Sequence, residues 1–466
     1  MNRAIARLAL LFVFAYAVLF ARQLYVQIVE APRLARDVHN PRTTLIAAYR
    51  GAIVARDGTV LARSTPHGRI YPLGAALAHT VGYASARYGN AGLEAAFDAD
   101  LAPRPLGNDP LAQLQALVTK SPLAAARPGT TVVTTIDPVV ERALDDGLRQ
   151  YPRGAGVALD PRTGEILAIA SVPSFDPERV DADFATVRSD PASPLLDRAL
   201  DGLYPPGSTF KIVIAAAALD AGVVTMDSTF EDDGALPVGN FVVHDDEGEA
   251  TGSQDLTGAF ALSSNVDFAR IALSLGVDRW YAAAARFRLG DSLDFPLPVA
   301  RDRLPARATV SPSILAQRGF GQADLLVTPL RMALIAATVA AGGVEPHPEL
   351  VRALRRDGRD ELLPAAEPLA TPMTAGAANE LRTMMVAVVE RGSGKTAALP
   401  DVQVAGKTGT ATNPGGRSHS WFVAFAPASA PRIAVAIVVE NVGYGAVFAA
   451  PIARRVIAAA LAHERS

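Results

Sequence analysis

The first apolar positions of the chain follow helical spacing. Residues 8–21 carry no charge, and apolar side chains continue at helical intervals to residue 29, before Pro32 ends the run. Arginines precede and follow this uncharged core and can reach the two polar interfaces of a bilayer. We therefore predict one membrane-spanning helix over residues 4–31. A cleaved signal peptide is the alternative interpretation, and either one exports the rest of the chain.

Short apolar runs separated by turn residues follow the N-terminal helix. The clearest is GAIVARDGTVLA, where two alternating runs flank Asp57-Gly58, a hairpin turn signal. Further on, the run TTVVTTI predicts a strand before a helix capped by Asp137, and GAGVALD with GEILAIAS predicts a hairpin. HSWFVAFAP and PRIAVAIVVE predict two more strands near the end. Strands at both ends of this region, with helices between them, predict an α/β fold with one antiparallel sheet and a helical lobe.

Composition excludes several classes of partner and site. The net charge is −3, and no basic run is present that would bind nucleic acid. The chain has no cysteine, which excludes disulfides, thiolate metal sites and cysteine catalysis. The seven histidines are scattered and form no H-E-x-x-H motif, so we predict neither a metal nor a cofactor. We interpret His419 as a surface or loop residue.

Lysine is rare in this chain, which makes its few positions informative. Of 44 basic residues only four are lysine, and these are Lys120, Lys211, Lys395 and Lys407. A buried lysine can accept a proton, whereas an arginine stays charged in a protein. Positions where this arginine-rich chain keeps lysine therefore merit a close look; the alternative is chance, which we accept for Lys120.

A Ser-x-x-Lys pair stands at the start of an alanine-rich helical run. Pro205, Pro206 and Gly207 precede Ser208, which places its hydroxyl at a helix N-terminus, where backbone N–H groups favour negative charge. Lys211 follows one helical turn later, so a neutral amine there can take the seryl proton. The structural alternative is that Ser208 only caps the helix.

A polar triplet, Ser263-Ser264-Asn265, interrupts a second apolar helical pattern. The hydroxyl of Ser263 could relay a proton between the lysines and a leaving group. The side chain of Asn265 could hold a substrate amide with both of its ends. The structural alternative is a loop or cap between two helices.

The third group is Lys407-Thr408-Gly409-Thr410, in an alternating run that predicts a strand. Gly409 would let a substrate backbone lie close beside the strand, and Lys407 with the two threonine hydroxyls could bind a carboxylate. Backbone N–H groups of Thr410 and Ser208 could form an oxyanion hole. A phosphate-binding loop also contains Gly-Lys-Thr, but the glycine that it requires five residues before its second glycine is missing here.

The order and spacing of these three groups resemble those of penicillin-binding proteins and serine β-lactamases. The similarity to class B penicillin-binding proteins extends over nearly the whole chain and includes RGAIVARDGTVLA, YPPGSTFK, GFGQADLLVTPLRMA and AGKTGTA. It implies a penicillin-binding/serine β-lactamase-like transpeptidase domain behind a small pedestal and a transmembrane anchor. We expect the anchor, the pedestal or linker domain and the transpeptidase domain over residues 1–31, 32–127 and 128–466.

The resemblance also implies a peptidoglycan D,D-transpeptidase and a role for each motif residue. Ser208 would attack the penultimate D-alanyl carbonyl of a stem peptide, with Lys211 as base. Ser263 and Lys407 would assist proton transfer, and Asn265 would orient the substrate, while the threonines of the third group would hold the donor carboxylate. An amine of a second stem peptide would then form the cross-link. β-Lactam antibiotics would acylate the same serine.

The expected setting follows from the same resemblance. The chain leaves no room for a glycosyltransferase domain, so a membrane glycosyltransferase of the SEDS family (shape, elongation, division and sporulation) is the implied partner. The protein is expected in the cell (inner) membrane with a single pass and an extracytoplasmic catalytic domain. Elongation, division and sporulation roles stay open. Other functions stay open too: a D,D-carboxypeptidase, an exported serine β-lactamase or sensor, and a non-catalytic cell-wall scaffold.

Overall fold

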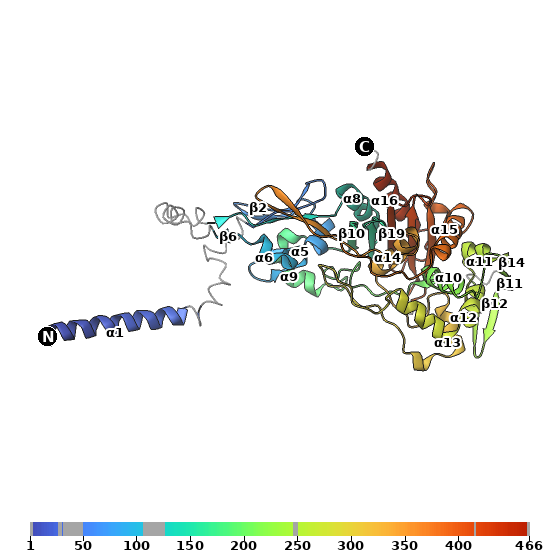
Figure 1. Ribbon diagram of the computed structural model, residues 1–466, viewed down its shortest axis with the longest axis horizontal. Coiled ribbons are helices and arrows are strands. Elements are labelled where there is room, and N and C mark those ends of the chain that lie inside the picture. The colour runs from blue at the N-terminus through green and yellow to red at the C-terminus, as the bar shows by residue number, and fades with distance from the viewer. Residues whose placement is uncertain are drawn as a thin grey trace.

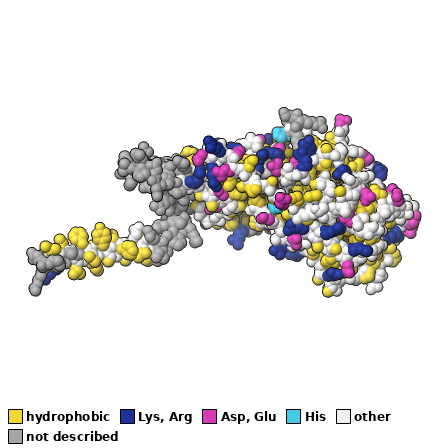
Figure 2. All heavy atoms as spheres, viewed as in Figure 1, with side chains coloured by type: hydrophobic (Ala, Val, Ile, Leu, Met, Phe, Trp, Pro, Cys, Tyr) yellow, Lys and Arg dark blue, Asp and Glu magenta, His cyan; other side chains and the backbone are white. Residues whose placement is uncertain are grey.

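A computed structural model describes residues 3–26, 30, 50–105, 126–245, 250–413 and 416–463 (Figure 1). Its first element, α1 (Arg3–Tyr25), carries many exposed large apolar side chains (Figure 2). Within the described ranges, no helix is both long and apolar enough to cross a membrane. The spanning helix over residues 4–31 therefore stays a prediction, and part of it lies outside the described residues.

A six-stranded sheet forms the N-terminal part of the body. Its strands are β1 (Ile53–Val54), β2 (Val60–Thr65), β3 (Gly68–Ile70), β8 (Thr131–Thr134), β15 (Val351–Arg356) and β16 (Arg359–Leu362). The hairpin predicted at Asp57-Gly58 is confirmed, because β1 and β2 pair antiparallel around it. The strand predicted for TTVVTTI also forms, as β8, but it pairs with β1 and β15. Segments far apart in the chain thus build this sheet together.

Short elements pack around the six-stranded sheet. They are α4 (Ala78–Val81), β4 (Ala84–Ser85), β5 (Gly89–Asn90), α5 (Gly92–Ala96), α6 (Asp98–Leu101), β6 (Arg104–Pro105), β7 (Ala126–Arg127) and α9 (Val180–Ser189). A buried carboxylate ties α5 to the sheet, since Glu94 accepts hydrogen bonds from Arg50 Nε at 2.5 Å and from Arg69 Nε of β3 at 2.6 Å. Pairing of this kind is required of a charge that folding removes from water.

The second sheet has five antiparallel strands in the order β10-β9-β19-β18-β17. They are β9 (Gly154–Leu159), β10 (Ile166–Val172), β17 (Ala405–Ala411), β18 (His419–Ala426) and β19 (Ile433–Val439). Both faces are covered (Figure 1), one by α8 (Pro138–Leu148) and α16 (Ala449–His463), the other by α14 (Pro329–Ala340). This explains the nearly continuous apolar runs, because a strand buried on both faces needs no polar alternation. Strand β17 lies at an edge of the sheet.

A helical lobe packs beside β17. Its elements are η5 (Gly207–Phe210), α10 (Lys211–Asp220), β11 (Thr229–Asp232), β12 (Ala235–Val238), β13 (Phe241–His244), β14 (Gly252–Asp255), α11 (Leu256–Leu262), α12 (Asn265–Arg286), α13 (Pro312–Arg318) and α15 (Ala375–Glu390). Eight of the ten residues of α10 are buried, which explains its alanine-rich sequence, since small side chains let several elements approach it closely. The α/β arrangement predicted from the sequence is therefore present, with a five-stranded antiparallel sheet and a lobe of helices, and the lobe adds two short antiparallel pairs, β11–β14 and β12–β13.

Candidate active site

Ser208 lies in a tight turn between the sheet and the helical lobe. The 3-10 turn η5 contains it, and the α-helix begins only at Lys211, three residues later than the predicted helix start. Gly207 adopts a φ of 54°, in the left-handed region that favours glycine, and a Cβ there would lie 3.0 Å from the carbonyl oxygen of Thr410. The glycine therefore allows the serine turn to pack directly against β17.

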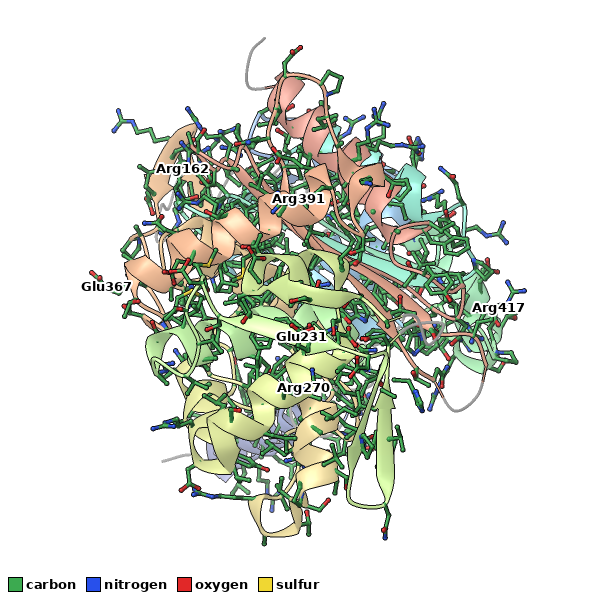
Figure 3. All side chains as sticks on the ribbon, turned by 90° about the vertical axis from the view of Figure 1, so that its right-hand side faces the viewer. Arg162, Glu231, Arg270, Glu367, Arg391 and Arg417 are labelled. Atoms are coloured by element: carbon green, nitrogen blue, oxygen red, sulfur yellow. The ribbon has the colours of Figure 1, made fainter. Side chains whose placement is uncertain are left out.

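A cavity of about 790 Å³ opens at Ser208. Its walls come from β17, the start of α12, the β12–β13 hairpin and the segment after β19. Asn265 and Thr410 line it together with the serine, so three of the predicted site residues face one space. The exposed Arg417, at the right of Figure 3, is also a lining residue.

The two lysines predicted as proton carriers meet at one hydroxyl group. Lys211 Nζ donates to Ser263 Oγ at 3.2 Å, and Lys407 Nζ donates to the same oxygen at 2.8 Å. Both lysine side chains are fully buried. The shared hydroxyl links the two amines, so a proton can pass between them through Ser263.

Ser263 occupies a strained backbone position. It lies between α11 and α12 with a φ of 69°, an uncommon value for a residue other than glycine. Its carbonyl oxygen accepts from Lys211 Nζ at 2.5 Å, while Ser264 caps α12 through a 3.0 Å bond from Asp267 N. The loop-or-cap interpretation of the triplet is therefore also correct. The two helices aim the Ser263 hydroxyl at the lysines.

The Asn265 side chain is already engaged at both ends. Its Oδ1 accepts from Lys211 Nζ at 2.9 Å, and its Nδ2 donates to the carbonyl oxygen of His244 at 3.1 Å. The oxygen keeps a second lone pair, so the prediction that both ends hold a substrate amide stays a prediction. An amide nitrogen carries two N–H groups, and the second can donate to a substrate carbonyl in the cavity.

The two threonines of the third group have different surroundings. Thr410 lines the cavity, and its strand forms the edge of the sheet, where some backbone N–H groups point outward. The hydroxyl of Thr408 lies 2.6 Å from that of Ser393, a residue that sequence reasoning did not select. Ser393 can donate to Thr408 and leave the threonine proton for a ligand.

Gly409 lies against residues of its own chain on the side where a Cβ would stand. A Cβ at this position would lie 2.9 Å from Thr209 Cγ2 and from Trp421 Cβ, and 3.0 Å from the carbonyl oxygen of Pro206. The space beside the glycine is thus filled by this chain, and none of it is left on that side for a substrate backbone. Gly409 brings the edge strand against the serine turn.

Replacing Gly409 with alanine is expected to lower the rate of acylation at Ser208 at least about tenfold, because the added methyl group separates β17 from the serine turn by a few tenths of an ångström. The second-order rate of labelling by a fluorescent penicillin measures this effect. Gly376→Ala is a suitable control, since its nearest neighbour would be Thr374 Oγ1 at 3.7 Å. Equal labelling of both variants would show that the close approach is unimportant.

Other cavity residues were not selected from the sequence. Gln322, at the end of the run GFGQ, donates to the carbonyl oxygen of Thr410 at 3.5 Å. Gly321 before it has a φ of 74°, and a Cβ there would meet the carbonyl oxygen of Gly207. The glycines around Phe320 were therefore a usable signal of close packing. The other lining residues include Phe241, Val242, Tyr444 and Phe448.

The interpretation of His419 as a surface or loop residue is wrong. The side chain is buried in β18, its ring lies edge-on to Tyr204 at 5.4 Å, and its Nδ1 accepts from Asn441 N at 3.3 Å. Burial lowers the pKa of His419. The residue begins a strand that is buried on both faces, so its place in the apolar run HSWFVAFAP indicated the burial.

A nucleophile at a cavity, next to buried lysines that share a hydroxyl, defines a serine acyl-enzyme of the Ser-x-x-Lys type. The chain matches two protein families: the penicillin binding protein transpeptidase domain over residues 154–458, and the penicillin binding protein A dimerisation domain over residues 50–119. It therefore belongs to the penicillin-binding protein transpeptidases.

Similar proteins cover the whole chain. The peptidoglycan D,D-transpeptidase PbpA of Mycolicibacterium smegmatis is 35% identical over 99% of both chains, and that of Mycobacterium tuberculosis is 34% identical over 100% of both. Among solved structures, penicillin-binding protein A of M. tuberculosis as its ceftriaxone acyl-enzyme has a TM-score of 0.80 at 33% identity, covering 90% of this chain and 99% of that one. The imipenem acyl-enzyme of the same protein has a TM-score of 0.79.

Proposed function

We propose that the protein is a peptidoglycan D,D-transpeptidase that cross-links stem peptides through an acyl-enzyme on Ser208. The observation that carries the proposal is the Ser263 hydroxyl shared by Lys211 and Lys407 beside the serine's cavity. It gives one site a nucleophile, a candidate base and a path for the proton. The acyl-enzyme structures of the M. tuberculosis relative support the same chemistry.

In the first step, Ser208 Oγ attacks the penultimate D-alanyl carbonyl carbon of the donor stem peptide. Lys211 takes the seryl proton, and backbone N–H groups of Ser208 and Thr410 stabilise the oxyanion. The peptide bond to the terminal D-alanine breaks, and the leaving amine receives a proton by way of Ser263 and Lys407. Free D-alanine departs and the donor remains esterified to the serine.

Binding groups around the serine hold the donor during this step. The second N–H of Asn265 Nδ2 donates to a backbone carbonyl of the stem peptide, and the hydroxyls of Thr408 and Thr410 donate to its terminal carboxylate. A β-lactam acylates the serine in the same way. Its ring carbonyl takes the place of the D-alanyl carbonyl, and its carboxylate takes the place of the terminal carboxylate. An amine from a second stem peptide then attacks the ester carbonyl and loses a proton to the lysine pair. As the new amide bond forms and the bond to Ser208 Oγ breaks, that proton returns to the serine oxygen.

We further propose a single-pass anchor in the cell (inner) membrane, with the catalytic domain outside the cytoplasm. The uncharged run at residues 8–21 and the exposed apolar side chains of α1 support this. A membrane glycosyltransferase of the SEDS family is the proposed partner. The reason is that the two matched domains account for most of the chain and neither is a glycosyltransferase.

The test is to incubate the purified full chain with a stem pentapeptide and an acceptor peptide, and to analyse the products by mass spectrometry. Cross-linked peptide and released D-alanine are expected, together with a penicillin adduct that survives a timed chase. Release of D-alanine with only the hydrolysed donor would indicate a carboxypeptidase. Rapid turnover of penicillin would indicate a β-lactamase, and no adduct on a folded sample would indicate a scaffold.

A further inference from the structure

The first residue of α12 is held by the end of the β12–β13 hairpin. Asp245 directly follows β13, and its Oδ1 accepts hydrogen bonds from the backbone N–H groups of Asn265 and Val266, the second at 3.3 Å. The carbonyl oxygen of the preceding residue, His244, accepts from Asn265 Nδ2 at 3.1 Å. Two consecutive residues therefore fix both the backbone and the side chain of Asn265.

The other carboxyl oxygen of Asp245 faces a second carboxyl group. Asp245 Oδ2 is buried, and within the described part of the chain no donor reaches it. Its neighbour is Asp232, at the end of β11, which already accepts from Gly234 N at 2.8 Å and from Thr251 Oγ1 at 2.5 Å. Two ionised carboxylates in contact repel each other. A proton on Asp245 removes this repulsion and supplies the missing hydrogen bond.

Nearby charges do not replace that proton. Asp267 adds a third carboxylate, whose Oδ2 accepts from Gln254 Nε2 at 2.7 Å. Arg270 lies 3.4 Å from Asp267 Oδ1 and donates to the carbonyl oxygen of Glu231 (Figure 3), while the Lys211 amine is bonded to Asn265 Oδ1. The guanidinium is thus committed to Asp267 and to β11, and the pair formed by Asp245 and Asp232 has no cation between its carboxyl groups among the described contacts.

The directions of the two titrations agree with this geometry. Burial, with the hydrogen bond and the charge of Asp232, raises the pKa of Asp245 to about 7. Burial also raises the pKa of Asp232, but hydrogen bonds from Asp245, Thr251 and Gly234 outweigh it and lower that pKa to about 2. At a pH between these two pKa values, the pair of carboxyl groups holds one proton.

We propose that Asp245 is a positioning residue for Asn265 and acts in its protonated form, donating to Asp232 while it accepts from the start of α12. The proposal rests on the proposed function, since Asn265 Oδ1 in turn holds the Lys211 amine at 2.9 Å. Loss of the proton sets two negative charges against each other and loosens the hairpin from α12. The pKa of Asp245 is raised on folding, so its stabilising effect is present at low pH and is lost as the pH rises through about 7.

An Asp245→Asn variant tests the proposal. Asparagine keeps an oxygen for the N–H groups of α12 and replaces the shared proton by a permanent N–H donor toward Asp232. The rate of labelling by a fluorescent penicillin is measured for wild type and variant between pH 6.5 and pH 8.5. At each pH the wild-type rate is divided by the variant's rate, so that the titration of the lysines cancels. This ratio is expected to fall roughly 20-fold over the range.

Asp197→Asn is the matched control. Asp197 is a half-buried carboxyl that also caps backbone N–H groups, those of Ala199 and Leu200 at 3.0 and 3.3 Å, and desolvation raises its pKa to about 6. It lies outside the group around Asn265, so Asp197→Asn is expected to keep the wild-type pH profile. In Asp232→Asn, the new side-chain N–H donates to Asp245 and replaces the shared proton from the other partner. This variant is used for the test if Asp245→Asn does not fold.

Three results would decide the matter. A wild-type rate that stays parallel to that of Asp245→Asn at every pH overturns the role of the proton. A normal wild-type adduct at pH 6.5 in that same experiment leaves the proposed transpeptidase function standing. The absence of any wild-type adduct at pH 6.5 contradicts the proposed function itself and the positioning role with it.

Discussion

Replacement of Ser208 with alanine is expected to abolish covalent labelling by penicillin and to leave the fold intact. Ser208 lines the cavity and stands three residues before the buried Lys211, and removal of an activated nucleophile lowers rates by about 10⁴-fold or more. The variant should unfold at the same temperature as wild type, because Ser208 is half-buried and its turn is fixed by Gly207 and Pro206. Mass spectrometry of the intact protein after penicillin treatment measures the loss.

The control for this substitution is Ser311→Ala. Ser311 is also a half-buried serine at a helix start, where its hydroxyl accepts from Ile314 N at 3.3 Å, but it lies outside the described walls of the cavity. It is expected to lose about 1 kcal/mol of stability through the missing cap and to label normally. An adduct on Ser208→Ala that maps to the 204–211 peptide would exclude Ser208 as the nucleophile.

Much of the active site could be predicted because its polar residues lie in three short sequence motifs. Ser208 and Lys211 lie one turn apart, and each of the other motifs supplies its polar groups within four consecutive residues. The lysine positions were informative for a second reason, because the chain otherwise uses arginine as its basic residue. The structure brings Lys211 and Lys407 to the Ser263 hydroxyl, although 144 residues separate Lys407 from Ser263.

Contacts between distant segments could not be predicted in the same way. Asp232 and Asp245 are ordinary polar residues in the sequence, and their contact depends on how β11 and the β12–β13 hairpin meet. The packing of Gly409 against Thr209 likewise depends on the approach of β17 to the serine turn. Strand β8 has the residues of a strand, but its partners β1 and β15 are chosen by burial of apolar side chains such as Val132, which periodicity does not reveal.

The Ser263 position shows where local rules and the site disagree. Serine disfavours a positive φ, so a loop predicted from propensity alone would place glycine or asparagine there. The backbone carbonyl of residue 263 accepts from Lys211 and holds the turn, and serine is needed for the hydroxyl, which accepts from both Lys211 and Lys407. Strain held by bonds to a catalytic group is typical of functional sites, and here it can be traced to particular atoms.

Replacement of Lys211 with arginine is expected to lower the rate of acylation about 10³-fold although the positive charge is retained. Arginine cannot give up its proton at accessible pH, so it cannot accept the seryl proton, and general-base catalysis contributes about 10²–10⁴-fold. The rate of penicillin labelling measures the loss. Lys395→Arg is the matched control, because Lys395 is exposed and lies outside the described cavity walls, and it should label at the wild-type rate.

Arginine is also larger than lysine, and Lys211 is fully buried, so a loss of rate in Lys211→Arg alone could reflect distorted packing. Lys211→Ala separates the two causes, because it leaves space beside Ser263 and Asn265 for a small primary amine from solution. If Lys211 is the base, added ethylamine should restore part of the labelling rate. The restored rate should be proportional to the concentration of neutral ethylamine and should therefore rise with pH. A rate that ethylamine does not change, combined with wild-type labelling of Lys211→Arg, would remove Lys211 from the proton path and leave Lys407 as the base.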